Sequence, residues 1–105
     1  MGWYGTDFDG TLAYHSGGDT NELGEPIPLM LARVKQWLKE GKEVRIVTAR
    51  ACFPFMILQV NAWCKKHGLG NLKVTNQKDF QMIELWDDRA VQIIPNTGKR
   101  ADGLP

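Results

Sequence analysis

The sequence is poor in cysteine and histidine. Its only cysteines are Cys52 and Cys64, and it contains two histidines. Neither cysteine belongs to a Cys-x-x-Cys motif and no clustered histidines accompany them, so a cysteine-based zinc site is not expected. We interpret the two residues as buried thiols in a protein of the reducing cytoplasm.

Long hydrophobic runs and an excess of one charge are also missing. No segment approaches the roughly 20 consecutive apolar residues of a membrane span. The N-terminus has no basic run followed by a long apolar stretch, so no signal peptide is expected. The formal net charge is +1, which gives no indication of binding to a membrane or to nucleic acid.

The composition is that of a globular protein. The chain has 105 residues, of which 43% are hydrophobic and 24% charged. We therefore predict a single domain over residues 1–105. Residue patterns predict strands at residues 3–8, 43–48, 72–75, 83–86 and 91–94, with helices at residues 28–40 and 54–67. Strands alternating with helices in so short a chain favour an α/β fold, with three layers and helices on both faces of a parallel sheet.

Polar side chains follow the predicted strands where these end. In chain order they are Asp7 and Asp9, Thr48, Lys78, and the pair Asp87 and Asp88. The carboxyl ends of parallel strands share one edge, where ligands bind, so these groups are expected to lie together. Several carboxylates in one small volume raise each other's pKa unless a cation is present. A hard divalent ion with oxygen ligands, Mg²⁺ by preference, meets that need.

This set of groups suits phosphoryl transfer. A phosphate ester repels an anionic nucleophile, and Mg²⁺ with Lys78 would offset the repulsion. A carboxylate that attacks phosphorus forms an aspartyl phosphate, and we assign that attack to Asp7. Asp9 would protonate the leaving oxygen and later deprotonate the hydrolytic water. Both carboxylates face the same side only if the chain bends after the strand, which Gly10 makes easy.

Donors for the phosphoryl oxygens are also present. The hydroxyl of Thr48 can donate a hydrogen bond, and so can backbone amides of the loop after the first strand, at Gly10 and Thr11. Arg50, at the edge of the crevice, is a candidate for substrate contact. His15 lies in the polar loop at residues 13–26, and an exposed loop histidine without a role explains it more simply.

Together these residues resemble the motifs of the haloacid dehalogenase superfamily of phosphatases, over residues 7–88. The string Asp-Phe-Asp-Gly-Thr-Leu at residues 7–12 is similar to the first motif, Thr48 to the second, Lys78 to the third and Asp87-Asp88 to the fourth. The interval between Lys78 and Asp87 is too short for a helix. If Lys78 is not the third-motif lysine, Lys73 is the nearby alternative, within a strand.

The resemblance implies a Rossmann-like sheet ordered 5-4-1-2-3 and Mg²⁺-dependent hydrolysis of phosphate esters. It makes Asp7 the nucleophile and Asp9 the acid/base. It places Mg²⁺ between Asp7, Asp87, Asp88 and the backbone carbonyl of Asp9. Larger members insert a cap domain, whereas here the first gap holds only the polar loop, so the site is expected to be capless and open.

The substrate stays undecided between several classes. An open site suits a phosphorylated small metabolite, a phosphorylated polymer end such as a nucleic-acid 3′ end, or closure by a second subunit of a homo-oligomer. Asp88-Arg89 is weakly similar to the phosphatase domain of polynucleotide kinases, but the net charge gives no sign of a basic groove. A signalling receiver module carries similar residues. Such a module begins with its acidic pair, and here the pair comes last.

Overall fold

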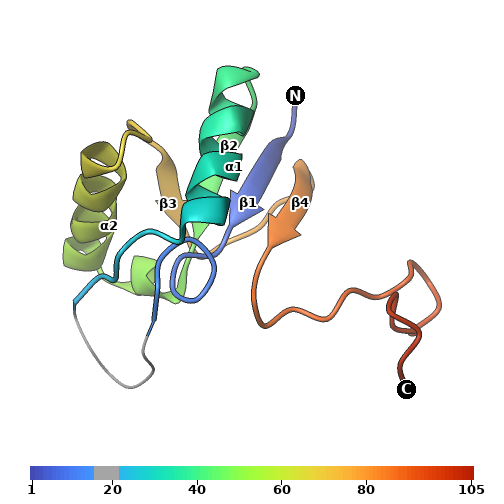
Figure 1. The fold of residues 1–105 in the computed structure, drawn as a ribbon. Helices are drawn as coiled ribbons and strands as arrows, with labels where there is room; N and C mark the ends of the chain where they lie inside the picture. The colour runs from blue at the N-terminus through green and yellow to red at the C-terminus, as the bar shows by residue number, and fades with distance from the viewer. Residues whose placement is uncertain (16–21) are drawn as a thin grey trace.

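In the computed structural model, residues 1–15 and 22–105 are described (Figure 1). The predicted loop at residues 13–26 therefore lies partly outside the described residues. The helices and strands in chain order are β1 (Trp3–Thr6), α1 (Pro28–Lys39), β2 (Glu43–Val47), a 3₁₀ turn (Ala49–Cys52), α2 (Pro54–Lys66), β3 (Lys73–Thr75) and β4 (Met82–Trp86). None of the helices in these two ranges is long and apolar enough to cross a membrane.

The four strands form one parallel sheet in the order β3-β2-β1-β4. The α/β class and the first four predicted strands are confirmed, each within two residues at either end. The prediction of a fifth strand at residues 91–94 is wrong. Because this strand does not form, the predicted order of five strands is not confirmed. Asn96 and Gly98 have positive φ angles of 64° and 72°. They turn the chain back, so Ile93 forms an isolated antiparallel bridge with Arg100 instead of joining β4.

Both helices lie on one face of the sheet. Their buried side chains, which include Val34 of α1 and Val60 of α2, form a single core cluster with Val44 and Ile46 of β2. The chain steps from β1 to β2 and then to β3 in one direction, and right-handed crossovers then place both helices on the same side. The prediction of three layers is therefore wrong: the described residues form two.

The two cysteines have different surroundings. Cys64 of α2 is fully buried, and burial raises the pKa of its thiol to about 11. Cys52 is exposed, because it ends the 3₁₀ turn that carries the chain over the surface from β2 to α2. The prediction of two buried thiols is confirmed for Cys64 and is wrong for Cys52.

On the second face of the sheet one aromatic side chain is fully buried, whereas Ile83 and Leu85 of β4 stay exposed. Trp3 is fully buried and lies over Gly5, where an added Cβ would be 3.0 Å from the Trp3 ring. Its indole N–H donates a hydrogen bond to Asp79 Oδ1 at 2.9 Å. The guanidinium of Arg45 lies 4.5 Å from the centre of the Trp3 ring system. Trp3 thus packs on the face that a second layer of helices covers in most parallel sheets.

Trp3→Ala is expected to lower the free energy of unfolding by about 3–5 kcal/mol, because it removes the largest side chain from this face and leaves a cavity over Gly5. Urea unfolding followed by circular dichroism measures the change. Trp3→Phe keeps one aromatic ring and loses the hydrogen bond to Asp79 together with part of the buried ring system, and it should cost less, about 1–2 kcal/mol. Equal losses in the two variants would contradict the role assigned to the Trp3 ring.

The chain after β4 leaves the sheet. It runs outward from Trp86 and ends away from the helices and strands (Figure 1). The radius of gyration is 14.3 Å, against about 13 Å for a compact chain of this length. Residues 90–105 therefore contribute little to the core, and none of them lines the cavity described next.

Candidate active site

A cavity of about 790 Å³ lies at the carboxyl edge of the sheet. The sequence-predicted residues that line it are Asp7, Asp9, Gly10, Thr48, Asp87 and Asp88. They come from the ends of β1, β2 and β4, which are neighbours in the sheet. The topology therefore brings most of the predicted site together, as the shared edge of parallel strands requires.

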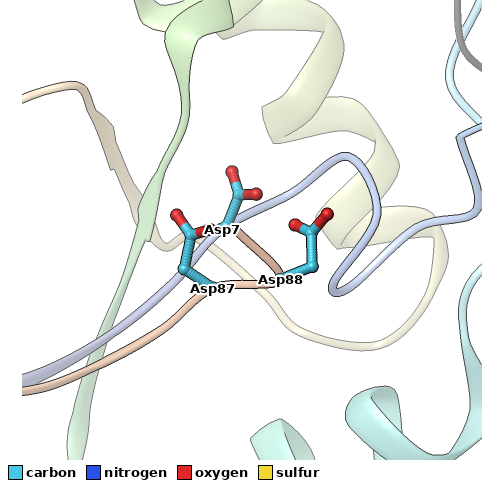
Figure 2. A group of neighbouring side chains, drawn as sticks. All are labelled: Asp7, Asp87 and Asp88. Atoms are coloured by element: carbon cyan, nitrogen blue, oxygen red, sulfur yellow. The ribbon is translucent and has the colours of Figure 1, made fainter. Parts of the chain in front are cut away.

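The side chains of Asp7, Asp87 and Asp88 are neighbours at this edge and project to the same side of the backbone (Figure 2). One carboxylate oxygen from each residue lies within 4.8 Å of the others. The Asp7 N–H donates a hydrogen bond to the Trp86 carbonyl at 2.8 Å, which ties the end of β1 to the end of β4. Backbone pairing between the two strands therefore sets the spacing of the carboxylates.

Without a cation, the negative charges of these three carboxylates repel one another. The pKa of Asp7 is raised from its ordinary value of 3.8 to about 7. Burial is the largest cause, and a hydrogen bond with Asp88 and the charges of Asp87 and Asp88 add to it, while the Phe8 amide acts in the opposite direction. Asp7 consequently holds a proton near neutral pH unless positive charge is supplied.

Thr11 and Gly10 hold Asp88 in place. The Thr11 hydroxyl donates a hydrogen bond to Asp88 Oδ1 at 2.9 Å and accepts one from the Asp88 N–H at 3.0 Å. Burial alone would raise the pKa of Asp88, but the hydrogen bonds from Thr11 and Asp7 outweigh it and lower that pKa. Gly10 has a φ of +85°, and a Cβ there would lie 2.6 Å from Asp88 Oδ2. Only glycine fits both the turn and the close approach.

The pKa of Asp7 predicts a pH-dependent stability. Because folding raises this pKa, the folded state binds the extra proton between about pH 4 and pH 7, and stability falls as the pH rises through that range. Asp7→Asn should therefore raise the melting temperature by a few degrees, about 2–5 °C, near pH 8 without divalent ions, and change it little near pH 4. Differential scanning calorimetry checks this.

MgCl₂ near pH 8 should raise the melting temperature of the wild type more than that of Asp7→Asn, because a bound cation stabilises only the ionised cluster. Asp102→Asn, a change in the exposed tail, is the matched control and should respond to Mg²⁺ as the wild type does. If Asp7→Asn and the wild type had the same melting temperature at every pH, the raised pKa assigned to Asp7 would be contradicted.

Asp9 is paired with Arg50. Arg50 Nε donates to Asp9 Oδ2 at 2.7 Å, and a terminal nitrogen of the same guanidinium donates to Asp9 Oδ1 at 2.9 Å. His15 Nδ1 lies 3.6 Å from Asp9 Oδ1. Asp9 lines the cavity and Arg50 does not, so the predicted contact of Arg50 with substrate is not present in this arrangement. The sequence gives no sign of this pair, which joins residues 41 positions apart.

Thr48 directly follows β2 and lines the cavity. It is 3% exposed, and its Oγ accepts a hydrogen bond from the Arg50 N–H at 3.1 Å. Because a hydroxyl has one donor and two acceptor positions, Thr48 keeps its own proton for a ligand in the cavity. The donor role of Thr48 toward a substrate stays a prediction.

The backbone amides of Gly10 and Thr11 are engaged inside their own loop. The Gly10 N–H donates to the Ala13 carbonyl at 2.8 Å, and the Thr11 N–H donates to the Phe8 carbonyl at 3.3 Å. Both amides therefore already have acceptors in this arrangement, and their contact with substrate stays a prediction. The hydrogen bonds of these amides close the tight turn after β1. The Thr11 side chain positions Asp88.

Lys78 does not reach the cavity. It lies in the segment after β3 and its side chain is exposed, outside the set of residues that line the cavity. Lys73, the alternative, is exposed within β3. The cavity-lining residue from this part of the chain is Asn76, which directly follows β3. Sequence reasoning missed Asn76, although its place after a strand was the signal that identified the other residues.

Arg89 and His15 also line the cavity. Arg89 follows the acidic pair, and its N–H donates to Asp87 Oδ1 at 2.7 Å. Its charge also contributes to the lowered pKa of Asp88, after the hydrogen bonds described above. His15 is exposed, as predicted for a loop histidine, and it lies beside Asp9 at the edge of the cavity.

Comparisons with known proteins show the fold alone. No protein-family model matches the chain, and no curated protein matches its sequence. One solved structure, described as a conserved protein from Bacteroides thetaiotaomicron, is similar with a TM-score of 0.68 and 20% sequence identity. The similarity covers 99% of this chain and 81% of that one. This chain therefore shares its α/β architecture with a known bacterial protein.

Proposed function

We propose that the protein is a Mg²⁺-dependent phosphohydrolase of the haloacid dehalogenase type, which hydrolyses phosphate monoesters through an aspartyl phosphate on Asp7. The observation that carries the proposal is the single cavity shared by Asp7, Asp87, Asp88, Asp9 and Thr48. It combines a cluster of carboxylates, a further carboxylate outside that cluster and a hydroxyl donor. These are the groups that nucleophilic attack on phosphorus and later hydrolysis require.

The residues present fit a divalent cation. Three carboxylate oxygens lie within 4.8 Å of one another, and hard oxygen donors suit Mg²⁺ or Mn²⁺. The raised pKa of Asp7 is the expected result for such a cluster without positive charge. Asp7, Asp87 and Asp88 would hold the ion with their side chains, and the carbonyl oxygen of Asp9 stays a predicted fourth ligand. The ion would neutralise charge on the carboxylates and on the phosphoryl oxygens.

In the first step, a carboxylate oxygen of Asp7 attacks the phosphorus atom. The bond from phosphorus to the leaving oxygen breaks, and that oxygen takes a proton from Asp9 and departs as an alcohol. The Thr48 hydroxyl donates a hydrogen bond to a phosphoryl oxygen, which helps to orient the group. The product of this step is an aspartyl phosphate on Asp7.

In the second step, water attacks the same phosphorus atom. Asp9, now ionised, takes a proton from the water, and the bond between phosphorus and the Asp7 oxygen breaks. Inorganic phosphate leaves, and both carboxyl groups return to their starting states. The presence of Asp9 beside the nucleophile favours this turnover over a receiver module, which must keep its phosphoryl group for longer.

A screen for phosphatase activity tests the proposal. The purified full chain is incubated with p-nitrophenyl phosphate, sugar phosphates, nucleotides and 3′-phosphorylated oligonucleotides, with MgCl₂ or with EDTA. Release of inorganic phosphate that requires Mg²⁺ is the expected result, and the best substrate separates a metabolite from a nucleic-acid end. Hydrolysis that persists in EDTA, or none with any monoester, would contradict the proposal.

A further inference from the structure

Residues 91–102, called the arm below, form a small hairpin beyond β4. The Ile94 N–H donates a hydrogen bond to the Lys99 carbonyl, and the Ala101 N–H donates one to the Gln92 carbonyl, both at 2.8 Å. No residue of the arm belongs to the core cluster of buried side chains. Because an isolated hairpin of two strands is only marginally stable in water, the arm needs a surface on which to pack.

The arm exposes apolar side chains. Val91, Ile93 and Ile94 are 51%, 45% and 44% exposed. All three are β-branched, and such side chains are favoured in strands where they pack against other apolar groups. Apolar side chains that are exposed together, unlike single ones, indicate an interaction site. The arm therefore has the composition of a docking element.

β4 also exposes an apolar surface. Ile83 and Leu85 are 56% and 37% exposed, and because they are two positions apart on a strand they share one face of the sheet. An added Cβ at Gly5 would lie 3.2 Å from Leu85 Cδ1, so this is the face on which Trp3 lies. Within the described ranges β4 is the last strand of the sheet, and its outer edge is open to another chain.

The surface of the chain is larger than that of a compact monomer. The accessible surface area is 7223 Å², against about 5,950 Å² for a compact monomer of 11.9 kDa. The difference of about 1,300 Å² exceeds the roughly 800 Å² that each partner buries in a protein interface of standard size. The surplus surface of each copy is therefore sufficient for a stable dimer.

We propose that the protein is a homodimer in which the arm of each copy packs on β4 of the other. The same chain carries both exposed surfaces, so a two-fold axis lets each copy give one arm and receive one. In a single copy the chain after β4 runs outward from the sheet (Figure 1), and neither surface is covered by the other. The inference concerns assembly and does not depend on the proposed phosphatase activity.

The mass of the full chain in solution tests the dimer. Sedimentation equilibrium of the wild type at about 50 µM should give twice the chain mass of 11.9 kDa, with a Kd of about 1 µM or tighter. Ile93→Asp places a carboxylate in each arm contact and should raise the Kd about 100-fold or more. Ile93 lies outside the core cluster, so this variant should keep its fold, which circular dichroism checks. Leu58→Asp, the same kind of change at an exposed position of α2, is the control and should dimerise as the wild type does.

A mixture of two variants tests which surfaces meet. Ile83→Lys changes β4 and should also be monomeric by itself. An equal mixture of Ile93→Asp and Ile83→Lys should form a heterodimer, because one arm contact is unchanged and the other brings a carboxylate to an ammonium group. Contact between two arms, or between two β4 strands, would instead leave one of the two variants dimeric on its own.

Four results overturn the proposal. A wild type that stays monomeric at about 50 µM would assign the arm to a partner other than this chain. A dimer that persists in Ile93→Asp would exclude the arm from the interface, and dimerisation of folded Ile83→Lys by itself would exclude β4. A mixture of the two variants that stays monomeric would exclude the reciprocal exchange. If Ile83→Lys does not fold, the milder Ile83→Thr replaces it and should raise the Kd about tenfold; an unchanged Kd would contradict the role of β4.

Discussion

Asp7→Asn is expected to abolish the hydrolysis of an aryl phosphate, with a fall in kcat of about 10⁴-fold or more. The amide oxygen of asparagine is a poor nucleophile and cannot form the acyl phosphate. The side chains have nearly the same shape, so the fold and the tie between the Asp7 N–H and the Trp86 carbonyl should remain. Steady-state assays with p-nitrophenyl phosphate and MgCl₂ measure the loss.

The control for Asp7→Asn is the same change at a distant site. Asp102 lies in the exposed tail, 2.8 Å from Arg100, and Asp102→Asn should keep full activity. Circular dichroism and melting curves show whether Asp7→Asn is folded. A folded Asp7→Asn that retains more than about a tenth of the wild-type kcat would exclude Asp7 as the nucleophile and would point to direct attack by water.

Asp9→Asn is expected to stop the reaction after the first step. Asparagine cannot take a proton from water, so hydrolysis of the aspartyl phosphate should slow by about 10²- to 10⁴-fold. The first step with p-nitrophenyl phosphate needs little acid assistance, because nitrophenolate is a good leaving group. The variant should therefore release about one nitrophenolate per protein in a rapid burst, followed by a slow steady state.

The phosphoenzyme itself can be observed in Asp9→Asn. Acid quenching after the burst, followed by intact-protein mass spectrometry, should show one added phosphoryl group. Hydroxylamine should remove it, as expected for an acyl phosphate. The double variant Asp7→Asn/Asp9→Asn is the control and should acquire no label. A slow Asp9→Asn variant that shows neither burst nor label would place Asp9 in the first step alone.

Much of the site follows from local sequence. A short apolar strand that runs into Asp7 and Asp9, a second that ends at Thr48, and a third that ends at Asp87 and Asp88 are visible without coordinates. Parallel strands share one carboxyl edge, so these residues had to meet once the strands were identified. The prediction failed for Lys78, because a residue three positions beyond a strand is placed by the path of its loop. Asn76, directly after β3, lines the cavity instead.

The sequence by itself determined the four parallel strands, the two helices and the carboxylates that gather at one edge, because periodicity and strand ends are local properties. Only the tertiary structure decided what those groups contact. It paired Asp9 with Arg50, and it placed the Thr11 hydroxyl where it donates a hydrogen bond to Asp88. It also placed both helices on one face of the sheet and Trp3 on the other. Such contacts join residues far apart in the chain, and no local pattern encodes which distant partner satisfies a buried charge or covers an apolar face.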